Sequence, residues 1–168
     1  MNAKNLYVHL YGLLDNITPI KADCGKLCGS ACCKGDEDTG MYLFPYEETM
    51  FSGNESWIKI YDSDFLSGNK PVKIAICNGT CERSKRPLSC RIFPLFLSEE
   101  KLICTDLRAS HICPLAAAKI DFNEYNPEFI NNVTRVFNIL MKFKTTRRYI
   151  SDTQKIIEEY EEINNIFK

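Results

Sequence analysis

The stretch that decides the fold lies at residues 22–33 and reads ADCGKLCGSACC. It places Cys24, Cys28, Cys32 and Cys33 in one short segment. Thiolates are soft ligands that suit Zn²⁺, Cu(I) and iron–sulfur clusters. A short segment can supply several of them to one centre, because only small loops need to close. This segment therefore predicts a metal centre around which the rest of the chain is arranged.

Five more cysteines follow this first group. Cys77, Cys81 and Cys90 form a second group, and Cys104 and Cys113 come after it. One tetrahedral zinc ion or one four-iron cube takes four protein ligands. Distant segments would therefore complete the centre and tie the fold together. Cys104 stands inside an apolar strand candidate, where we expect a small buried residue and no ligand.

A secreted, disulfide-bonded protein fits this sequence less well. Nine cysteines in 168 residues fall below the roughly 8–10% of short disulfide-rich chains, and an odd number cannot all pair. Residues 6–14 do not form the uninterrupted apolar run of a signal peptide. No stretch reaches the roughly 18 apolar residues of a membrane span. We therefore expect a cytoplasmic protein with reduced thiols and no membrane partner.

Composition narrows the protein class further. The formal net charge is −1, which argues against nucleic acid as a partner. The apolar share of 45% excludes a disordered chain of low hydrophobicity. The length fits a single domain over residues 1–168.

The patterning predicts an α+β fold. We expect a small, irregular cysteine-rich core with short strands at about residues 20–115, flanked by an N-terminal helix and by a C-terminal helical segment at about 126–167. The expected elements are a helix at 3–17, a loop at 23–40, a strand at 41–44 followed by one helical turn, strands at 57–61 and 72–76, a hairpin at 92–97 and 101–105, a helix at 114–120, a helix from 126 to 141, and a last helix that opens at a capping box formed by Ser151 and Gln154.

The cysteine spacing excludes several common metal motifs. The two-residue knuckles of zinc ribbons and most zinc fingers are absent, and so is the spacing of bacterial ferredoxins. Radical enzymes that use S-adenosylmethionine need a tighter second gap and a barrel larger than this chain allows. The spacing thus favours a less common cysteine cluster.

Three blocks of the chain resemble one family. They are CGKLCGSACC at residues 24–33, GMYLFPYE at residues 40–47 and, most specifically, RPLSCRIFP at residues 86–94. They are similar to the motifs of the zinc- or iron-chelating cysteine-cluster proteins, the CxxCxxCC or YkgJ-type family. The resemblance covers about residues 20–115. The opening gaps of three and three residues are wider than that family's usual gaps.

The resemblance implies metal binding through eight cysteines. By position these are Cys24, Cys28, Cys32, Cys33, Cys77, Cys81, Cys90 and Cys113. Which of them share a metal stays open, and His111 is an alternative ligand beside Cys113. Arg86 and Arg91 flank Cys90, and we interpret them as cations that favour thiolate and offset the negative charge of a loaded site.

Three functional hypotheses follow from this pattern. The first is a metal-binding protein with an iron–sulfur cluster of the 4Fe–4S type, or with zinc. Iron–sulfur is favoured because the adjacent Cys32 and Cys33 suit a crowded multi-metal centre. The second is an iron–sulfur oxidoreductase with a redox partner protein, for which the sequence assigns no catalytic residue. The third is a zinc-stabilised structural or interaction module with closed four-cysteine sites.

Overall fold

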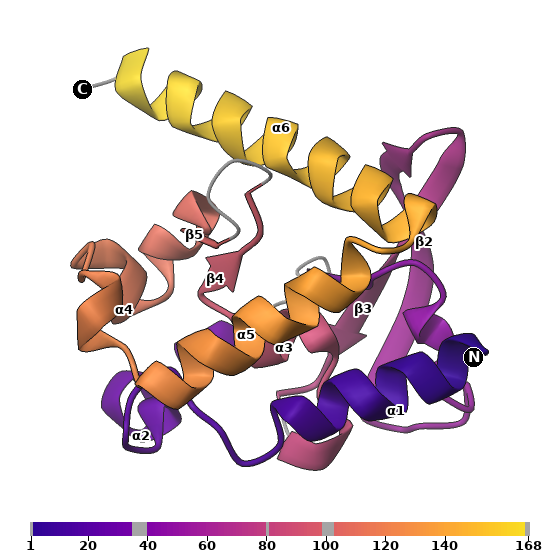
Figure 1. Ribbon diagram of the computed structural model, residues 1–168, viewed down its shortest axis with the longest axis horizontal. Helices are drawn as coiled ribbons and strands as arrows, with labels where there is room; N and C mark the ends of the chain where they lie inside the picture. The colour runs from indigo at the N-terminus through magenta and orange to yellow at the C-terminus, as the bar shows by residue number, and fades with distance from the viewer. Residues whose placement is uncertain (1, 35–39, 80, 99–102, 167–168) are drawn as a thin grey trace.

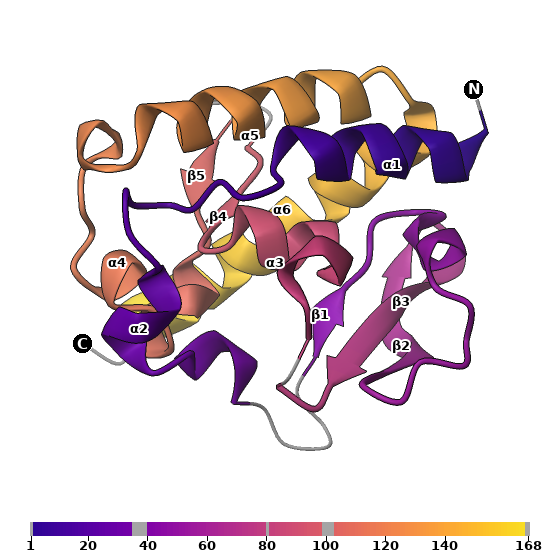
Figure 2. The same ribbon diagram turned by 90° about the horizontal axis from the view of Figure 1, so that it is seen from below.

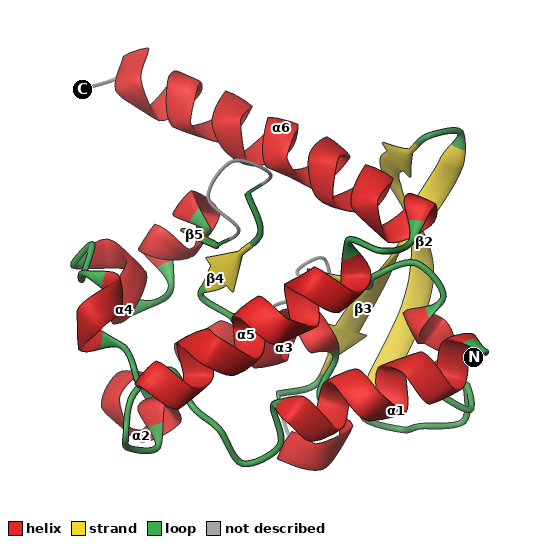
Figure 3. Cartoon of the chain, in the orientation of Figure 1, coloured by secondary structure: helices red, strands yellow, loops and turns green. Residues whose placement is uncertain are grey.

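The computed structural model describes residues 2–34, 40–79, 81–98 and 103–166. It has the predicted α+β architecture, with a three-stranded antiparallel sheet at one end and helices over the rest (Figure 3). The helices, 3₁₀ turns (η) and strands are α1 (Ala3–Leu13), α2 (Cys24–Cys28), η1 (Ala31–Cys33), β1 (Met41–Tyr42), η2 (Glu47–Met50), β2 (Ile58–Ser67), β3 (Lys70–Cys77), η3 (Arg83–Lys85), α3 (Leu88–Ile92), β4 (Leu95–Phe96), β5 (Cys104–Thr105), η4 (Leu107–His111), α4 (Pro114–Ala117), η5 (Phe122–Glu124), α5 (Pro127–Leu140) and α6 (Lys144–Ile166).

Three long helices dominate the molecule. Asn2 caps α1 by accepting a hydrogen bond from the amide of Asn5 at 2.8 Å. Asn126 caps α5 in the same manner, and Pro127 takes the first helical position, where a missing amide hydrogen leaves no bond unmade. α1 lies beside α5, and α6 runs back across the molecule after a short turn (Figures 1 and 2). Among the described helices, none is both long and apolar enough to cross a membrane.

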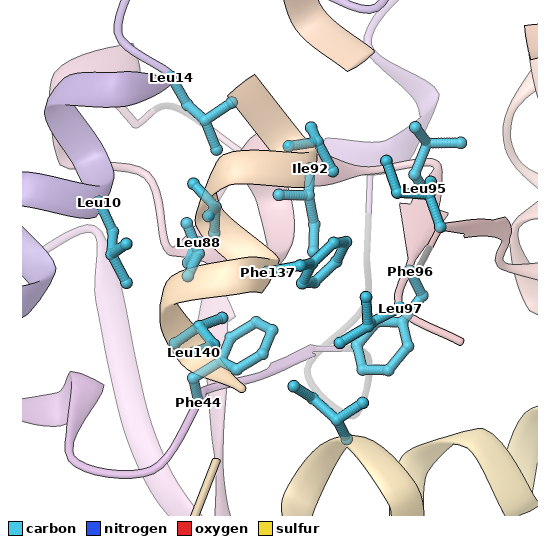
Figure 4. Close-up of a cluster of buried hydrophobic side chains, with 14 of the residues drawn as sticks. Leu10, Leu14, Phe44, Leu88, Ile92, Leu95, Phe96, Leu97, Phe137 and Leu140 are labelled. Carbon is cyan, nitrogen blue, oxygen red and sulfur yellow. The ribbon is translucent and has the colours of Figure 1, made fainter. Parts of the chain in front are cut away.

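Phe137 lies at the centre of the largest buried cluster (Figure 4). Its side chain is completely buried. The cluster draws apolar residues from every layer, among them Leu10 and Leu14 of α1, Leu88 and Ile92 of α3, Leu95 and Phe96 of β4, and Leu140 of α5. Each such side chain contributes roughly 1.5–3 kcal/mol when it is buried, so this cluster fixes α3 against the long helices.

The three-stranded sheet has the order β1-β3-β2, and both pairings are antiparallel. Its register pairs Met41 with Ala75 and Ile58 with Cys77. A second, small buried cluster lies on this sheet, and the Cys77 side chain packs against it. The end of β3 thereby carries a cysteine from the sheet toward the segment that holds α2 and η1.

The prediction for the last helix is wrong at its start. α6 begins at Lys144, so Ser151 and Gln154 lie inside the helix and form no capping box. The residues between Lys144 and Ser151 include no helix-breaking residue. The side chains of Tyr149 and Ile150 in this stretch are buried against the core. Tertiary packing therefore extends α6 by two turns beyond the local capping pattern.

The cysteine segment also differs from the prediction. A loop was expected at residues 23–40, but α2 and η1 form within it. The predicted hairpin is present as β4 and β5, although Ile92 belongs to α3. Residues 35–39 and 99–102, which include parts of the predicted loop and hairpin, lie outside the described residues.

Candidate metal centre

α2 presents the first two cysteines on one helical turn. Asp23 caps the helix by accepting a hydrogen bond from a backbone amide at 3.1 Å. Cys24 and Cys28 are four positions apart and share a face, with the Cys28 Sγ 3.6 Å from the Cys24 carbonyl oxygen. Gly29 ends the helix in the left-handed conformation, at φ 59°. The chain then turns into η1, whose last two residues are the adjacent cysteines.

Cys77 ends β3, and the loop that follows carries Cys81 and rests on the first cysteine segment. Gly79 in this loop has φ 80°, and a Cβ there would lie 2.8 Å from the carbonyl oxygen of Cys33. A side chain at this position would therefore be both strained and in collision with the backbone. The glycine lets the loop lie directly against Cys33.

The buried Glu47 anchors α3, the helix that carries Cys90. Its carboxylate accepts hydrogen bonds from the amides of Phe44 at 2.9 Å and Leu88 at 2.5 Å. It also accepts one from the hydroxyl of Tyr11 at 2.6 Å. Burial raises the pKa of Glu47, and these hydrogen bonds oppose the shift. The carboxylate thus joins α1, the turn after β1 and the first residue of α3.

Arg91, next to Cys90, fixes the loop that precedes α3. Its guanidinium carbon lies 4.3 Å from the centre of the Tyr11 ring. Its Nε and Nη2 donate hydrogen bonds to the carbonyls of Arg86 at 2.8 Å and Ser84 at 2.7 Å. Arg91 also lines the larger pocket with the thiols, so its predicted role beside thiolates stays a prediction. Its hydrogen bonds to this loop in addition position Arg86.

All eight cysteines that were predicted as ligands line two adjoining pockets. The larger pocket, of about 660 Å³, is lined by Cys24, Cys28 and Cys113, the smaller, of about 170 Å³, by Cys77 and Cys81, and both by Cys32, Cys33 and Cys90. All eight are free thiols. α2 lies near α4, and the chain beyond α2 runs toward the end of β3 (Figure 2). Segments that are far apart in the sequence thus meet here.

Arg86 lines both pockets, and Lys34 also lines the smaller one. The sulfur atoms of Cys32 and Cys33 lie 3.9 Å apart. A hydrogen bond from Cys32 lowers the pKa of Cys33 to about 6, with burial opposing the shift and Arg86 adding to it. Burial lowers the pKa of Arg86, but its hydrogen bond with Cys81 and the neighbouring thiols Cys33 and Cys90 raise it overall. Arg86 therefore stabilises negative charge on this group of thiols.

Arg83 takes the corresponding place beside Cys24. Burial raises the pKa of the Cys24 thiol, Arg83 lowers it, and the nearby thiols Cys28 and Cys113 raise it. Arg83 and Arg86 have a further feature in common. The Nε of each is buried and has no hydrogen-bond partner among the described residues. Two N–H donors beside the cysteines are thus left to interact with negatively charged sulfur.

The thiols surround the pockets without meeting at a point. Among the described residues, no three Cys, His, Asp or Glu side chains already converge on a position that would hold a metal ion. A zinc ion draws its sulfur ligands to about 2.3 Å. Binding would therefore pull the thiols inward, or would involve a group larger than one ion. Either way, binding would order the segments that carry the thiols.

Two further residues, His111 and Cys104, stand outside the eight cysteines that line the two pockets. His111 is exposed in η4 and stands edge-on to Tyr160, with 6.2 Å between the ring centres. It is not among the residues that line the two pockets. Cys104 lies in β5, opposite Phe96, and its side chain is outside the described part of the chain.

Sequence reasoning missed Glu47 as a part of this site. The sequence places Glu47 at the end of the block at residues 40–47 and in a helical turn after Pro45, but its local pattern does not indicate burial. Pro45, which marks the start of the predicted turn, lies two residues before Glu47. The carbonyl of Pro45 accepts a hydrogen bond from the Tyr7 hydroxyl at 2.8 Å. The role of Glu47 depends on α1 and α3, which lie far from it in the sequence.

Comparisons of the chain with protein-family models, with curated proteins and with solved structures found no match. The resemblance to the cysteine-cluster family therefore rests on the three sequence blocks alone and stays a prediction.

Proposed function

We propose that this protein binds metal through its eight clustered cysteines, with an iron–sulfur cluster as the favoured group and zinc as the alternative. One observation carries the proposal: cysteines from four separate segments, between Cys24 and Cys113, line two pockets that adjoin at Cys32, Cys33 and Cys90. Eight free thiols do not gather in this way to serve a hydrophobic core. We also propose that the protein is cytoplasmic, because the reducing cytoplasm keeps the cysteine thiols free to bind metal.

The chemistry of the donor set fits such a group. Every candidate ligand is a thiol, the donor that selects zinc, Cu(I) and iron–sulfur clusters. The buried Nε–H groups of Arg83 and Arg86 lack partners among the described residues. Hydrogen bonds from such donors to sulfur stabilise thiolate and tune the reduction potential of a cluster. These residues are thus complementary to a negatively charged metal–sulfur group.

Two features favour iron–sulfur over isolated zinc ions. The sulfur atoms of Cys32 and Cys33 are 3.9 Å apart on adjacent residues, which suits a crowded multi-metal centre. The remaining thiols line the walls of the two pockets, and among the described residues no three of them converge on one position for a single ion. When bound, an iron–sulfur cluster supplies one-electron transfer. The chain's own part is to hold the thiols, to exclude water with the apolar wall of the pockets, and to offset charge through Arg83 and Arg86.

Anaerobic purification with metal and sulfide analysis and a visible spectrum tests this proposal. A brown protein with iron, labile sulfide and reversible bleaching by dithionite is the expected result. A colourless protein with stoichiometric zinc would overturn the iron–sulfur assignment and leave a closed zinc site with a structural role. A chain that takes up neither metal, even after anaerobic reconstitution, would overturn the proposal entirely.

Cysteine variants assign the metal to these pockets. Cys32→Ser and Cys90→Ser should each lower the metal content, because both residues line the two pockets. Cys104→Ser is the matched control, since it changes the one cysteine that the eight do not include. Full metal content in both pocket variants would contradict the ligand assignment.

A further inference from the structure

The last helix, α6, has one side against the core and one side exposed to solvent. It runs along the upper edge of the molecule (Figure 1), and its buried residues, such as Tyr149 and Ile157, lie on the inner side. Six charged residues with exposed side chains follow the opposite side of the helix: Lys144, Arg148, Lys155, Glu158, Glu159 and Glu162. Steps of three, four and seven residues keep them on one face. We call this face the outer face of α6.

The two halves of α6 carry opposite charge. Exposed cations occupy the first two turns, and exposed glutamates gather near the end: Lys144, Arg147 and Arg148 against Glu158, Glu159, Glu161 and Glu162. The first turn has no acidic residue, and the last turn has no basic one. The helix dipole favours the reverse order, because the N-terminal end of a helix is positive and its C-terminal end negative. A neighbouring helix of opposite direction would compensate both the charges and the dipole.

The outer face makes few ionic contacts within its own chain. Arg148 and Lys155 share the carboxylate of Asp152, with N–O distances of 3.8 and 3.7 Å. The side chains of these two cations are 63% and 67% exposed. In the part of the chain that the structure describes, neither Lys144 nor Glu162 forms an ion pair. The outer face is thus open to charges from another molecule.

The charges are also spaced symmetrically along the helix. Lys144 and Glu162 lie equally far from Thr153 in the sequence, and so do Arg148 and Glu158. When a second α6 lies antiparallel across the outer face with the two midpoints together, each of these cations meets a glutamate of the other copy. A two-fold axis makes every such contact occur twice. A parallel arrangement would instead place like charges opposite each other.

We propose that the protein forms a two-fold symmetric dimer in which the outer faces of two α6 helices pack antiparallel. The cationic first half of each helix lies against the glutamates of the other, and the two helix dipoles oppose each other. The contact is polar, so charge holds it and salt weakens it. No residue of α6 lines either cysteine pocket. The dimer is therefore independent of the proposed metal binding.

Analytical ultracentrifugation of the full chain at low and high salt tests the dimer. The Debye length falls from about 30 Å at about 0.01 M salt to about 3 Å at about 1 M salt. Wild type should be dimeric at the lower salt concentration and monomeric at the higher one. A monomer under both conditions would overturn the proposal, and so would a dimer that salt does not weaken.

Two charge-reversal variants locate the contact on α6. Lys144→Glu with Arg148→Glu makes both ends of the outer face acidic, and Glu158→Arg with Glu162→Lys makes both ends basic. Each variant alone should dimerise more than about tenfold more weakly than wild type, because like charges now face each other. An equimolar mixture of the two should form dimers with one copy of each, since opposite charges face each other again. Folded variants that stay monomeric in the mixture would overturn the proposal.

A chain with all four reversals keeps the test decisive even if one of the paired variants fails to fold. It exchanges the two signs without changing their symmetry, so it should recover the dimer of wild type. A folded monomer would overturn the proposal. Lys4→Glu with Lys59→Glu is the matched control, because both side chains are exposed outside α6 and the change in net charge equals that of the first variant. It should leave the dimer intact, and an equal loss of dimer would show that net charge, not the outer face, controls association.

Discussion

The long helices α1, α5 and α6 differ from the segments that carry the cysteines in both length and support. α5 has 14 residues and α6 has 23, whereas α2 and α3 have five each and η1 has three. The long helices bury apolar stripes in one shared cluster. In contrast, α2 and η1 contain no buried residue.

The contrast shows where the stability of each part comes from. Helices of five residues are unstable alone, because nucleation costs more than so few hydrogen bonds return. The cysteine segments are held by Asp23, Gly79, Glu47 and the two arginines, and on our proposal by metal. The helical part is held by apolar burial, so the two parts should respond differently to the same disturbance.

Metal removal should have the largest effect and should be confined to the cysteine segments. Structural zinc in small domains contributes about 10–16 kcal/mol of apparent binding free energy, and this is also folding free energy. We expect α2, η1 and the loop after β3 to lose amide protection on chelation while α1 and α5 keep theirs. Hydrogen exchange with and without chelator measures this. Equal loosening of both parts would show that the contrast is false.

Phe137→Ala should disturb the helical part most strongly. The side chain is completely buried at the centre of the main cluster (Figure 4), and such truncations cost about 3–5 kcal/mol. Denaturant unfolding measures the loss, and the metal content of the folded variant should be unchanged. Phe143→Ala is the control, because that ring is 37% exposed and its loss should cost less. Equal losses in the two variants would contradict the assigned core.

The helical part could be predicted from the sequence because apolar residues recur there at helical spacing. The apolar stripe and the Asn126 cap place α5 within two residues. The same reasoning placed the start of the last helix at Ser151, seven residues too late, because burial of Tyr149 and Ile150 outweighs a local cap. For α2, the capping residues Asp23 and Gly29 were present in the sequence, but the frequent glycines favoured a loop.

Glu47→Ala should weaken both parts, because the carboxylate connects them. It leaves the Tyr11 hydroxyl and the amides of Phe44 and Leu88 without an acceptor in a buried site. Each buried group without a partner costs about 1–3 kcal/mol, and we expect a total near 3 kcal/mol after relaxation. Denaturant unfolding of the metal-free protein measures this cost.

Glu48→Ala is the matched control for Glu47→Ala, since it removes a neighbouring carboxylate that is only half-buried. We expect it to change the unfolding free energy by less than about 0.5 kcal/mol. If both variants behaved alike, Glu47 would not be the connection between the helices and α3.

The site could be predicted only in part, since the spacing of cysteines identifies ligands but not neighbours. The sequence indicated eight cysteines, and the structure brings all eight to two pockets. The loop after β3 meets the first cysteine segment through one close approach, Gly79 against Cys33, which no spacing rule contains. Arg91 illustrates the same limit: its position beside Cys90 in the sequence predicts a cation near the thiols, but not that the Tyr11 ring and two carbonyls hold its guanidinium.

Two N-cap variants give the smallest and sharpest test of the comparison. Asp23 caps α2 and Asn126 caps α5 through the same side chain to amide hydrogen bond, and loss of such a cap costs about 1 kcal/mol. Asn126→Ala should lower the unfolding free energy by this amount whether or not metal is bound. Asp23→Ala should leave the metal-free protein unchanged, because α2 is then already disordered, and should weaken metal binding roughly fivefold. Denaturation with and without metal, together with a competition titration, separates the two effects. If Asp23→Ala destabilised the metal-free protein as much as Asn126→Ala does, α2 would be stable without metal and the two parts would not differ in what holds them.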